Sequence, residues 1–396
     1  MSKKNMKSSR PKRPRSIIEP NILRRKRRTG PTIEEYLVPL DTSADGEHSL
    51  LDSSFESDAG SKETETPRSY SHFRGIHCLP TPESSSTRAS PLPQIAWADP
   101  QNVWGLMVRK DVIYEHSAAV LNQHPALQPR MRTILLDWLI EVCEVYKLHR
   151  DTYYLAQDFV DRYLTKSSDL PKSQLQLLGI TALFLAAKIE EIYPPKLTEF
   201  AYVTDGACQE SEILDKELSI LITLNWDLTP VTVNGWLNVF LQVAADTEKR
   251  ETGTTDENFL HPKLSTCAFS RVSLLVDLCM LDIECLQFSY SIIAATALHH
   301  MVSPAVASAV SGYKTVQLLE CIEWMAPFAA IVHEELKHGT RTAVRDSHEI
   351  QIHHVNIQLL DKAFCLKKEY RQNSTPQKRD KTVSCGLGLL TPPPPE

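Results

Sequence analysis

The sequence predicts an all-α protein built from two similar helical units, and three observations support this. Between about residues 100 and 365, one segment after another carries apolar side chains at helical spacing. No convincing alternating strand and no glycine-rich phosphate loop interrupts these segments. A similar helical pattern occurs twice, about 110 residues apart, and a chain of 396 residues is long enough for two or three domains.

The N-terminal region to about residue 95 is expected to be disordered. Residues 1–28 hold twelve Lys or Arg against one acid, and residues 32–66 hold ten acids against one Lys. Neither stretch has an apolar periodicity, so neither can bury enough surface to offset the entropy lost on ordering.

A run of five basic residues in this region predicts nuclear import. The rest of the chain is acidic and supplies no second basic face, so we favour docking on an acidic import receptor over nucleic-acid binding. The alternative is that this charged run is only solvated and binds no partner. The run consists of Arg24, Arg25, Lys26, Arg27 and Arg28.

The predicted helix at 131–146 has more apolar surface than one core requires. Met131, Ile134, Leu135 and Trp138 form one stripe, and a second apolar stripe lies on another side. Such a helix is either wholly buried or presents its second stripe to a partner.

Two later segments, 174–189 and 288–302, are apolar on nearly all sides and rich in small residues, which favours the centre of a helical bundle. Each follows a long amphipathic helix and precedes a proline-containing connection. We therefore predict a duplicated unit with a boundary near Thr229. The amphipathic helices are expected at 152–164 and 264–281.

A last helix is predicted at 348–368, and the following tail ends in a proline run that should be extended. The expected divisions are a tail at 1–95, an N-terminal helical segment at 96–129, units at 130–228 and 229–345, a C-terminal helix at 346–368 and a tail at 369–396.

The sequence contains no recognisable catalytic or metal-binding motif, so we expect no enzyme, no cofactor and no metal. Nine cysteines form no CxxC pair, which indicates free, buried thiols in a reducing compartment. No run of 18 apolar residues predicts a membrane span, and the basic N-terminus lacks the apolar region of a signal peptide. Glu190 and Glu191 stand beside a Pro-Pro turn, and we interpret them as solvated or partner-facing.

Several of these segments resemble the cyclin family. Residues 131–164 are similar to the start of the cyclin box, and 175–208 are similar to its third helix and the following turn. The similarity over 130–228 is long and free of gaps. SPLPQIAWADPQNVWGLM at 90–107 and WLNVFLQV at 236–243 resemble E-type cyclins in particular.

The resemblance implies two five-helix bundles in tandem and a non-catalytic subunit that activates a cyclin-dependent kinase at the G1/S transition. Kinase 2 is the expected partner and the related kinase 1 the second candidate. A scaffold or an adaptor like transcription factor IIB would use the same bundles without activating a kinase. Lys188, Glu217 and the absence of a zinc ribbon favour the cyclin interpretation.

By the same resemblance, the first bundle should carry both the kinase face and a substrate-docking groove. Lys188 and Glu217 match kinase-contact positions, with Ile189, Leu221 and Trp226 as apolar neighbours. The groove should receive Arg-x-Leu segments of substrates and inhibitors, with Glu141 or Asp137 pairing the Arg; the alternative is that the stripe is all core. The groove residues are Met131, Ile134, Leu135, Trp138, Glu141 and Gln176.

Proline-directed phosphorylation sites lie outside the two units, at Thr66, Thr81, Ser90, Thr375 and Thr391. The surroundings of Thr81 and Thr391 resemble the two phosphodegrons of E-type cyclins, which an SCF ubiquitin ligase receptor reads. The family's C-terminal degron has a second phosphorylatable Ser where this chain has Pro395, so that site should be weakened.

The resemblance also extends to localisation. Trp236, Leu237 and Asn238 fall in a segment linked in the family to centrosome targeting, so the nucleus and, second, the centrosome are the expected locations.

Overall fold

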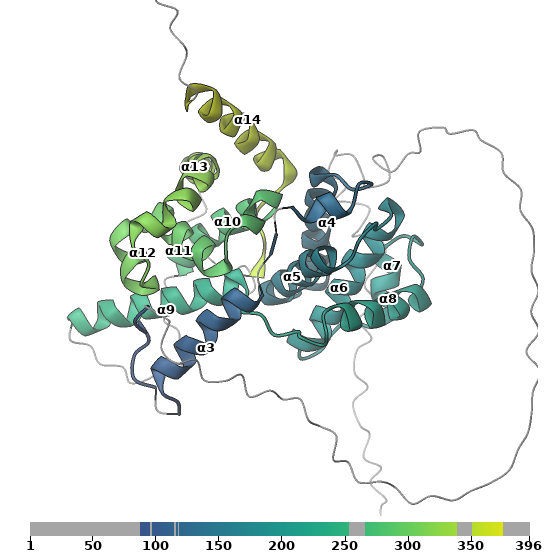
Figure 1. The fold of residues 1–396 in the computed structure, drawn as a ribbon, viewed down its shortest axis with the longest axis horizontal. Helices are drawn as coiled ribbons and strands as arrows, with labels where there is room; N and C mark the ends of the chain where they lie inside the picture. Colours follow the sequence, from purple (N-terminus) through teal and green to yellow (C-terminus); the bar gives the residue numbers. More distant parts are fainter. Residues whose placement is uncertain are drawn as a thin grey trace, which may run out of the picture. The chain divides into compact units, whose positions relative to one another are not determined.

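The computed structural model describes residues 88–95, 97–114, 116–117, 119–252, 266–338 and 351–374. Within them the protein is all-α, as predicted, and its one β feature is an isolated antiparallel bridge between Ile95 and Ala98. Twelve α-helices, α3 to α14, run in chain order through these residues (Figure 1).

Ten of these helices make two bundles of five, and one further helix stands at each end. The first bundle holds α4 (Pro129–Tyr146), α5 (Arg150–Lys166), α6 (Leu175–Glu190), α7 (Leu197–Val203) and α8 (Glu210–Thr223). The second holds α9 (Val233–Thr252), α10 (Thr266–Met280), α11 (Tyr290–Met301), α12 (Pro304–Ser311) and α13 (Thr315–His338). The flanking helices are α3 (Pro100–Ile113) and α14 (Ile357–Ser374), and 3-10 turns lie at Val120–Gln123, Lys172–Gln174 and Ile283–Gln287.

Helix α6 is the centre of the first bundle, as its composition predicts, because nearly every residue from Leu175 to Ala187 is buried. A Cβ atom at Gly179 would lie 2.6 Å from Cδ1 of Leu135. Glycine at 179 therefore lets α4 approach α6 closely, and it seats Leu135 in the core.

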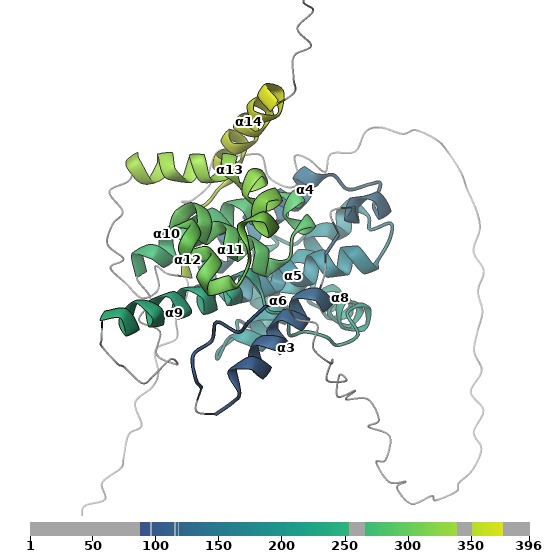
Figure 2. The same cartoon turned by 60° about the vertical axis from the view of Figure 1, so that its left-hand side comes forward.

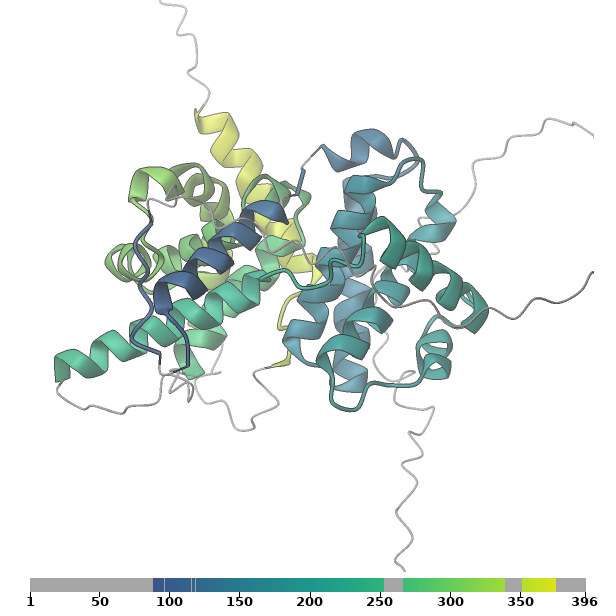
Figure 3. The same cartoon turned by 60° about the horizontal axis from the view of Figure 1, so that its bottom comes forward.

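Helix α3 lies beside α9 (Figures 2 and 3). The two helices meet through Trp104 and Trp236, whose ring centroids are 5.5 Å apart in an edge-on arrangement. Both indoles are fully buried, so the N-terminal helix is packed onto the second bundle through aromatic contacts.

A buried ion pair joins α4 to α5 in the first bundle, and its arginine also reaches the second bundle. Arg132 of α4 donates from Nε and Nη2 to the two carboxylate oxygens of Asp161 on α5, each at 2.7 Å. Its Nη1 donates to the carbonyl of Met280, the last residue of α10, at 3.1 Å. Arg132 and Asp161 are almost fully buried, and the bidentate geometry compensates for the loss of their hydration.

A second buried network corrects the predicted helix at 348–368. Residues 352–356 are not helical, because Arg150 of α5 donates from Nη2 to the carbonyl of Ile352 at 2.7 Å. His353 is buried beside Asp277, with Nδ1 3.0 Å from Oδ1. The backbone here serves tertiary contacts, so α14 begins only at Ile357 and continues past 368 to Ser374.

Burial and charge set the protonation of this network. Burial alone would raise the pKa of Asp277, but Arg150 and His353 hold it well below its usual range. Burial lowers the pKa of His353, although Asp277 acts in the opposite direction. The network therefore favours an ionised carboxylate beside a neutral imidazole.

One described helix, α13, is long and apolar enough to cross a membrane by length and composition alone. Half of its apolar window is buried inside the fold, and core helices of soluble proteins meet the same criterion. This is weak evidence for a span.

We expect Asp161→Asn to lower the free energy of unfolding by about 3 kcal/mol, because it leaves the Arg132 guanidinium buried without its counter-charge. Urea denaturation followed by circular dichroism measures the loss. The matched control is Asp361→Asn, which removes the carboxylate of a solvent-exposed pair with Arg130 and should cost less than about 1 kcal/mol. Equal losses in the two variants would contradict a special role for the buried pair.

Candidate protein-binding face

Exposed apolar side chains gather at the end of α6, in the connection that follows it, and along α8. Ile192 and Tyr193 are 87% and 91% exposed. On α8, Leu214, Leu218 and Ile222 are exposed and recur every four residues, so they line one side of the helix. An apolar surface of this extent on a folded chain marks a protein-interaction site.

An ion pair between Lys188 and Glu217 joins α6 to α8 at this face. Lys188 lies in the last turn of α6, where the helix dipole favours a cation, and its Nζ is 4.7 Å from the Phe184 ring centroid. Lys188 keeps 42% of its side chain exposed, whereas Glu217 keeps 10%. The ammonium group is therefore held in place yet open to a partner.

The loop after α8 projects a further aromatic side chain. Asn225 and Trp226 both have left-handed backbone angles, with φ of 53° and 58°. Bulky residues seldom adopt this conformation. The turn leaves the Trp226 indole 65% exposed at the end of α8.

The structure separates the other residues predicted for this face. Ile189 is exposed and flanks Lys188, whereas Leu221 is buried beneath α8 and supports the face from inside. Glu190 and Glu191 were expected to be solvated or partner-facing; Glu190 is exposed, whereas Glu191 is half-buried and hydrogen-bonded within the fold. Its carboxylate accepts hydrogen bonds from the backbone N of His149 at 2.7 Å and from Oγ1 of Thr152 at 2.6 Å, so it caps α5.

Sequence reasoning missed the exposed side chains Ile192, Tyr193, Tyr202, Leu214, Leu218 and Ile222. A signal was present on α8, since the apolar residues at 214, 218 and 222 form a stripe separate from the buried side at Ile213 and Ile220. The extended connection at 192–193 carries no such periodicity, and only its exposure in the fold identifies it.

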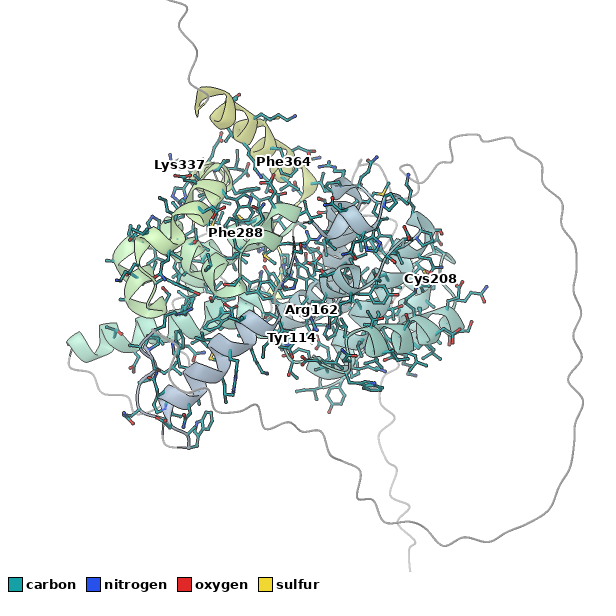
Figure 4. The ribbon with its side chains drawn as sticks, in the orientation of Figure 1. Tyr114, Arg162, Cys208, Phe288, Lys337 and Phe364 are labelled. Atoms are coloured by element: carbon teal, nitrogen blue, oxygen red, sulfur yellow. The ribbon has the colours of Figure 1, made fainter. Side chains whose placement is uncertain are left out.

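The end of α3 reaches the same region. Lys110 donates from Nζ to the carbonyl of Thr229 at 2.7 Å, and the Tyr114 hydroxyl donates to Asp227. The Arg162 guanidinium lies 4.7 Å from the Tyr114 ring centroid, and the two side chains can be followed in Figure 4. These contacts fix the loop that carries Trp226.

The predicted docking stripe is more buried than an open groove requires. Met131 and Ile134 are only 9% and 6% exposed, and Leu135 is fully buried against Gly179. Trp138 and Gln176 are half-buried and Glu141 is exposed. For Leu135 the structure favours the core alternative.

Other predicted positions are covered or lie outside the described residues. Trp236 and Leu237 are buried in the core and Asn238 is half-buried, so the centrosome-type segment is not an exposed motif. Ser90 is half-buried. The residues outside the described ranges are Thr66, Thr81, Thr375, Thr391, Pro395 and the basic run Arg24, Arg25, Lys26, Arg27 and Arg28.

Cysteines are only partly as expected. Cys143, Cys279 and Cys321 are buried, but Cys267 and Cys365 are exposed. Burial raises the pKa of Cys143 and Cys321, and that of Cys321 to about 12, so these thiols stay protonated. Across the described ranges, no group of three or more His, Cys, Asp or Glu is arranged to hold a metal ion.

Comparison with known proteins agrees with this architecture. Residues 102–229 match the family described as "Cyclin, N-terminal domain", and residues 231–356 match "Cyclin, C-terminal domain". The junction between the two matches falls beside Thr229, where the sequence predicts the boundary.

Full-length relatives identify the branch of the family. The chain is 44% identical over 378 residues to G1/S-specific cyclin-E of Hemicentrotus pulcherrimus, covering 93% of this chain and 85% of that protein. It is 47% identical over 328 residues to G1/S-specific cyclin-E1 of Gallus gallus, covering 82% of this chain and 76% of that protein. It is 48% identical over 284 residues to G1/S-specific cyclin-E1 of Mus musculus, covering 71% of this chain and 68% of that protein. The chain therefore belongs to the cyclin family, within its G1/S-specific cyclin-E group.

Proposed function

We propose that this chain is the regulatory subunit that binds and activates a cyclin-dependent kinase at the G1/S transition, without itself being an enzyme. The observation that carries the proposal is the exposed apolar face around the Lys188–Glu217 pair. Together with membership of the cyclin-E group, this face fits a permanent protein partner better than a small ligand.

The face suits a kinase whose regulatory C-helix has two positions. A partner that binds only the inward position stabilises the active state, in which the glutamate of that helix pairs with the lysine that positions ATP. Ile189, Leu218 and Trp226 offer apolar area for such a helix, and Lys188 offers a cation to its polar groups. Cyclin-dependent kinase 2 is the partner we propose first, and kinase 1 second.

We expect Lys188→Glu to weaken kinase binding by more than a hundredfold while the bundle stays folded. The substitution places two carboxylates, 188 and 217, at an interface that becomes dry on binding, at a cost of about 3–5 kcal/mol. Calorimetry or surface plasmon resonance with purified kinase 2 measures the affinity, and kinase activity on a short peptide measures activation.

The matched control is Lys172→Glu, the same charge reversal at an exposed lysine before the opposite end of α6. Near-normal binding is expected there. A Lys188→Glu variant that binds like the control would rule out this face, and a folded chain that binds no kinase would instead favour the scaffold or adaptor function.

We further propose that the accessible part of the docking stripe receives Arg-x-Leu segments of substrates and inhibitors. Trp138 supplies half-buried aromatic surface, Glu141 an exposed carboxylate one helical turn away, and Gln176 of α6 a neutral polar group. Met131, Ile134 and Leu135 are buried beneath these three side chains. A bound Leu would therefore contact the exposed edge of the stripe and displace its side chains only slightly.

We expect Trp138→Ala combined with Glu141→Lys to reduce binding of an Arg-x-Leu peptide at least tenfold and to leave kinase activation unchanged. Fluorescence anisotropy of the labelled peptide measures binding, and the same peptide with Arg replaced by Ala is the control ligand. Leu135→Ala is unsuitable as a test, because loss of a fully buried Leu should cost about 2–5 kcal/mol of stability. Unchanged peptide affinity in the double variant would contradict the groove.

We also propose that the tails control import and destruction. Arg24 to Arg28 would direct the chain to the nucleus, and phosphorylated Thr81 and Thr391 would recruit an SCF ubiquitin ligase receptor. A phosphothreonine supplies about −1.5 to −2 charges for an arginine cluster, and the preceding Leu fills an apolar pocket. Pro395 cannot take the second phosphate, so both degrons should contribute.

We expect Thr391→Ala to lengthen the half-life of the protein in cells at least twofold, with a further increase when Thr81→Ala is added. A cycloheximide chase measures both half-lives. Thr375→Ala is the control, since Thr375 also precedes a proline but has polar residues before it. A half-life of Thr391→Ala equal to that of the unmodified chain would reject the C-terminal degron.

A further inference from the structure

A cation in the segment that precedes α3 contacts three aromatic rings, and Leu92 of the same segment packs against the core. The guanidinium carbon of Arg88 lies 3.8 Å from the ring centroid of Tyr313, 4.9 Å from that of Trp104 and 5.9 Å from that of Trp236. These rings come from three places in the chain, and each offers its π face to the cation. We call residues 88–92 the strap.

The strap passes close to the turn that ends α12. A Cβ atom at Gly312 would lie 3.7 Å from the carbonyl oxygen of Ala89 and 3.9 Å from Cγ of Arg88. These are ordinary van der Waals distances, so glycine is required at 312 by its φ of 69°, which closes the helix in the left-handed conformation.

The Arg88 guanidinium lacks hydrogen-bond acceptors for two of its nitrogen atoms. Its Nε and Nη2 atoms are buried and have no hydrogen-bond acceptor within the described residues. Burial lowers the pKa of this guanidinium from its usual value, which reports the cost of its desolvation. By contrast Lys367, also near aromatic rings, reaches Asp282 and Glu284 at 2.7 Å each.

An acceptor for Arg88 can be created two residues away, at Ser90. Ser90 lies only two residues after Arg88 and is followed by Pro91, the pattern of proline-directed kinases. The Ser90 hydroxyl now donates to the carbonyl of Pro100 at 3.2 Å and accepts from the backbone N of Leu92 at 3.3 Å. The bond to Pro100, and a second from the backbone N of Ser90 to Oε1 of Gln101 at 3.3 Å, hold the strap against the start of α3, whereas the bond from Leu92 lies within the strap.

We propose that the strap is a switch, closed by Arg88 among Trp104, Trp236 and Tyr313 and opened by phosphorylation of Ser90. A proline-directed kinase transfers the γ-phosphoryl group of ATP: the Ser90 oxygen bonds to phosphorus, the bond to the bridging oxygen breaks, ADP leaves, and the hydroxyl proton passes to the kinase base. The phosphate removes the donor to Pro100 and offers Arg88 a bidentate, charge-assisted partner. Because the donors on Nε and Nη2 now lack an acceptor, pairing with the phosphate is favoured over the rings, and the strap lifts.

Lifting the strap uncovers Trp104 and Trp236, which are now fully buried. This consequence is independent of which kinase the chain activates, because any proline-directed kinase that modifies Ser90 produces it.

Hydrogen–deuterium exchange of the full-length chain tests the switch. The chain is treated with ATP and a proline-directed kinase, with mass spectrometry of the Ser90 peptide to measure the phosphate. Amides at 88–95 should exchange at least tenfold faster after phosphorylation, and those of α6 should not change. Kinase-treated Ser90→Ala is the matched control, because every other site is still modified in it.

Two substitutions at Arg88 complete the test. Arg88→Ala should open the strap without phosphate, and Arg88→Lys should keep it closed but respond less to phosphate, since lysine cannot pair bidentately. The proposal is overturned if phosphorylated chain and Ser90→Ala exchange alike, if Arg88→Ala leaves the strap protected, or if Ser90 takes up no phosphate.

Discussion

The bidentate pair between Arg132 and Asp161 is the interaction on which the rest of the structure depends. It joins α4 to α5 inside the first bundle, and the third donor of Arg132 reaches the end of α10 in the second. A charge this deeply buried loses its hydration, and hydrogen bonds to good acceptors offset that loss. The carbonyl of Met280 is such an acceptor, so the place where α10 ends is coupled to the first bundle.

The binding face exists because the first bundle buries only some of its apolar residues in the core. Helix α8 buries Ile213 and Ile220 against the core and leaves Leu214, Leu218 and Ile222 outside. Glu191 caps α5, and the chain after it turns outward through Ile192 and Tyr193. Lys188 stands between these elements, tied to Glu217 but still exposed. A helix of a partner with an apolar side and one acceptor group would complete the surface.

The two ends of the folded part are attached by cations with different partners. Lys367 on α14 is satisfied by two carboxylates as well as aromatic neighbours, which makes a durable attachment. Arg88 has aromatic faces but two buried donors without acceptors. Arg88 is also less buried than Lys367, and the lack of acceptors for its two donors is the basis of the proposed release of the N-terminal attachment.

Local sequence pattern by itself determined the all-α class, the duplicated helical unit and the central position of α6. These features depend on periodicity and composition, which each segment carries alone. The proposal that Lys188 and Glu217 contact a kinase came from family resemblance, because nothing local distinguishes them from a solvated charge pair.

The tertiary structure decided what depends on contacts between distant segments. Leu135 is core and not groove because Gly179 lies opposite it, and residues 352–356 are not helical because Arg150, some 200 positions earlier, takes the carbonyl of Ile352. Glu191 is a cap because α5 begins beside it. Helical periodicity measures only how apolar a side of a helix is; whether that side meets another segment or solvent is set by the packing of the whole chain.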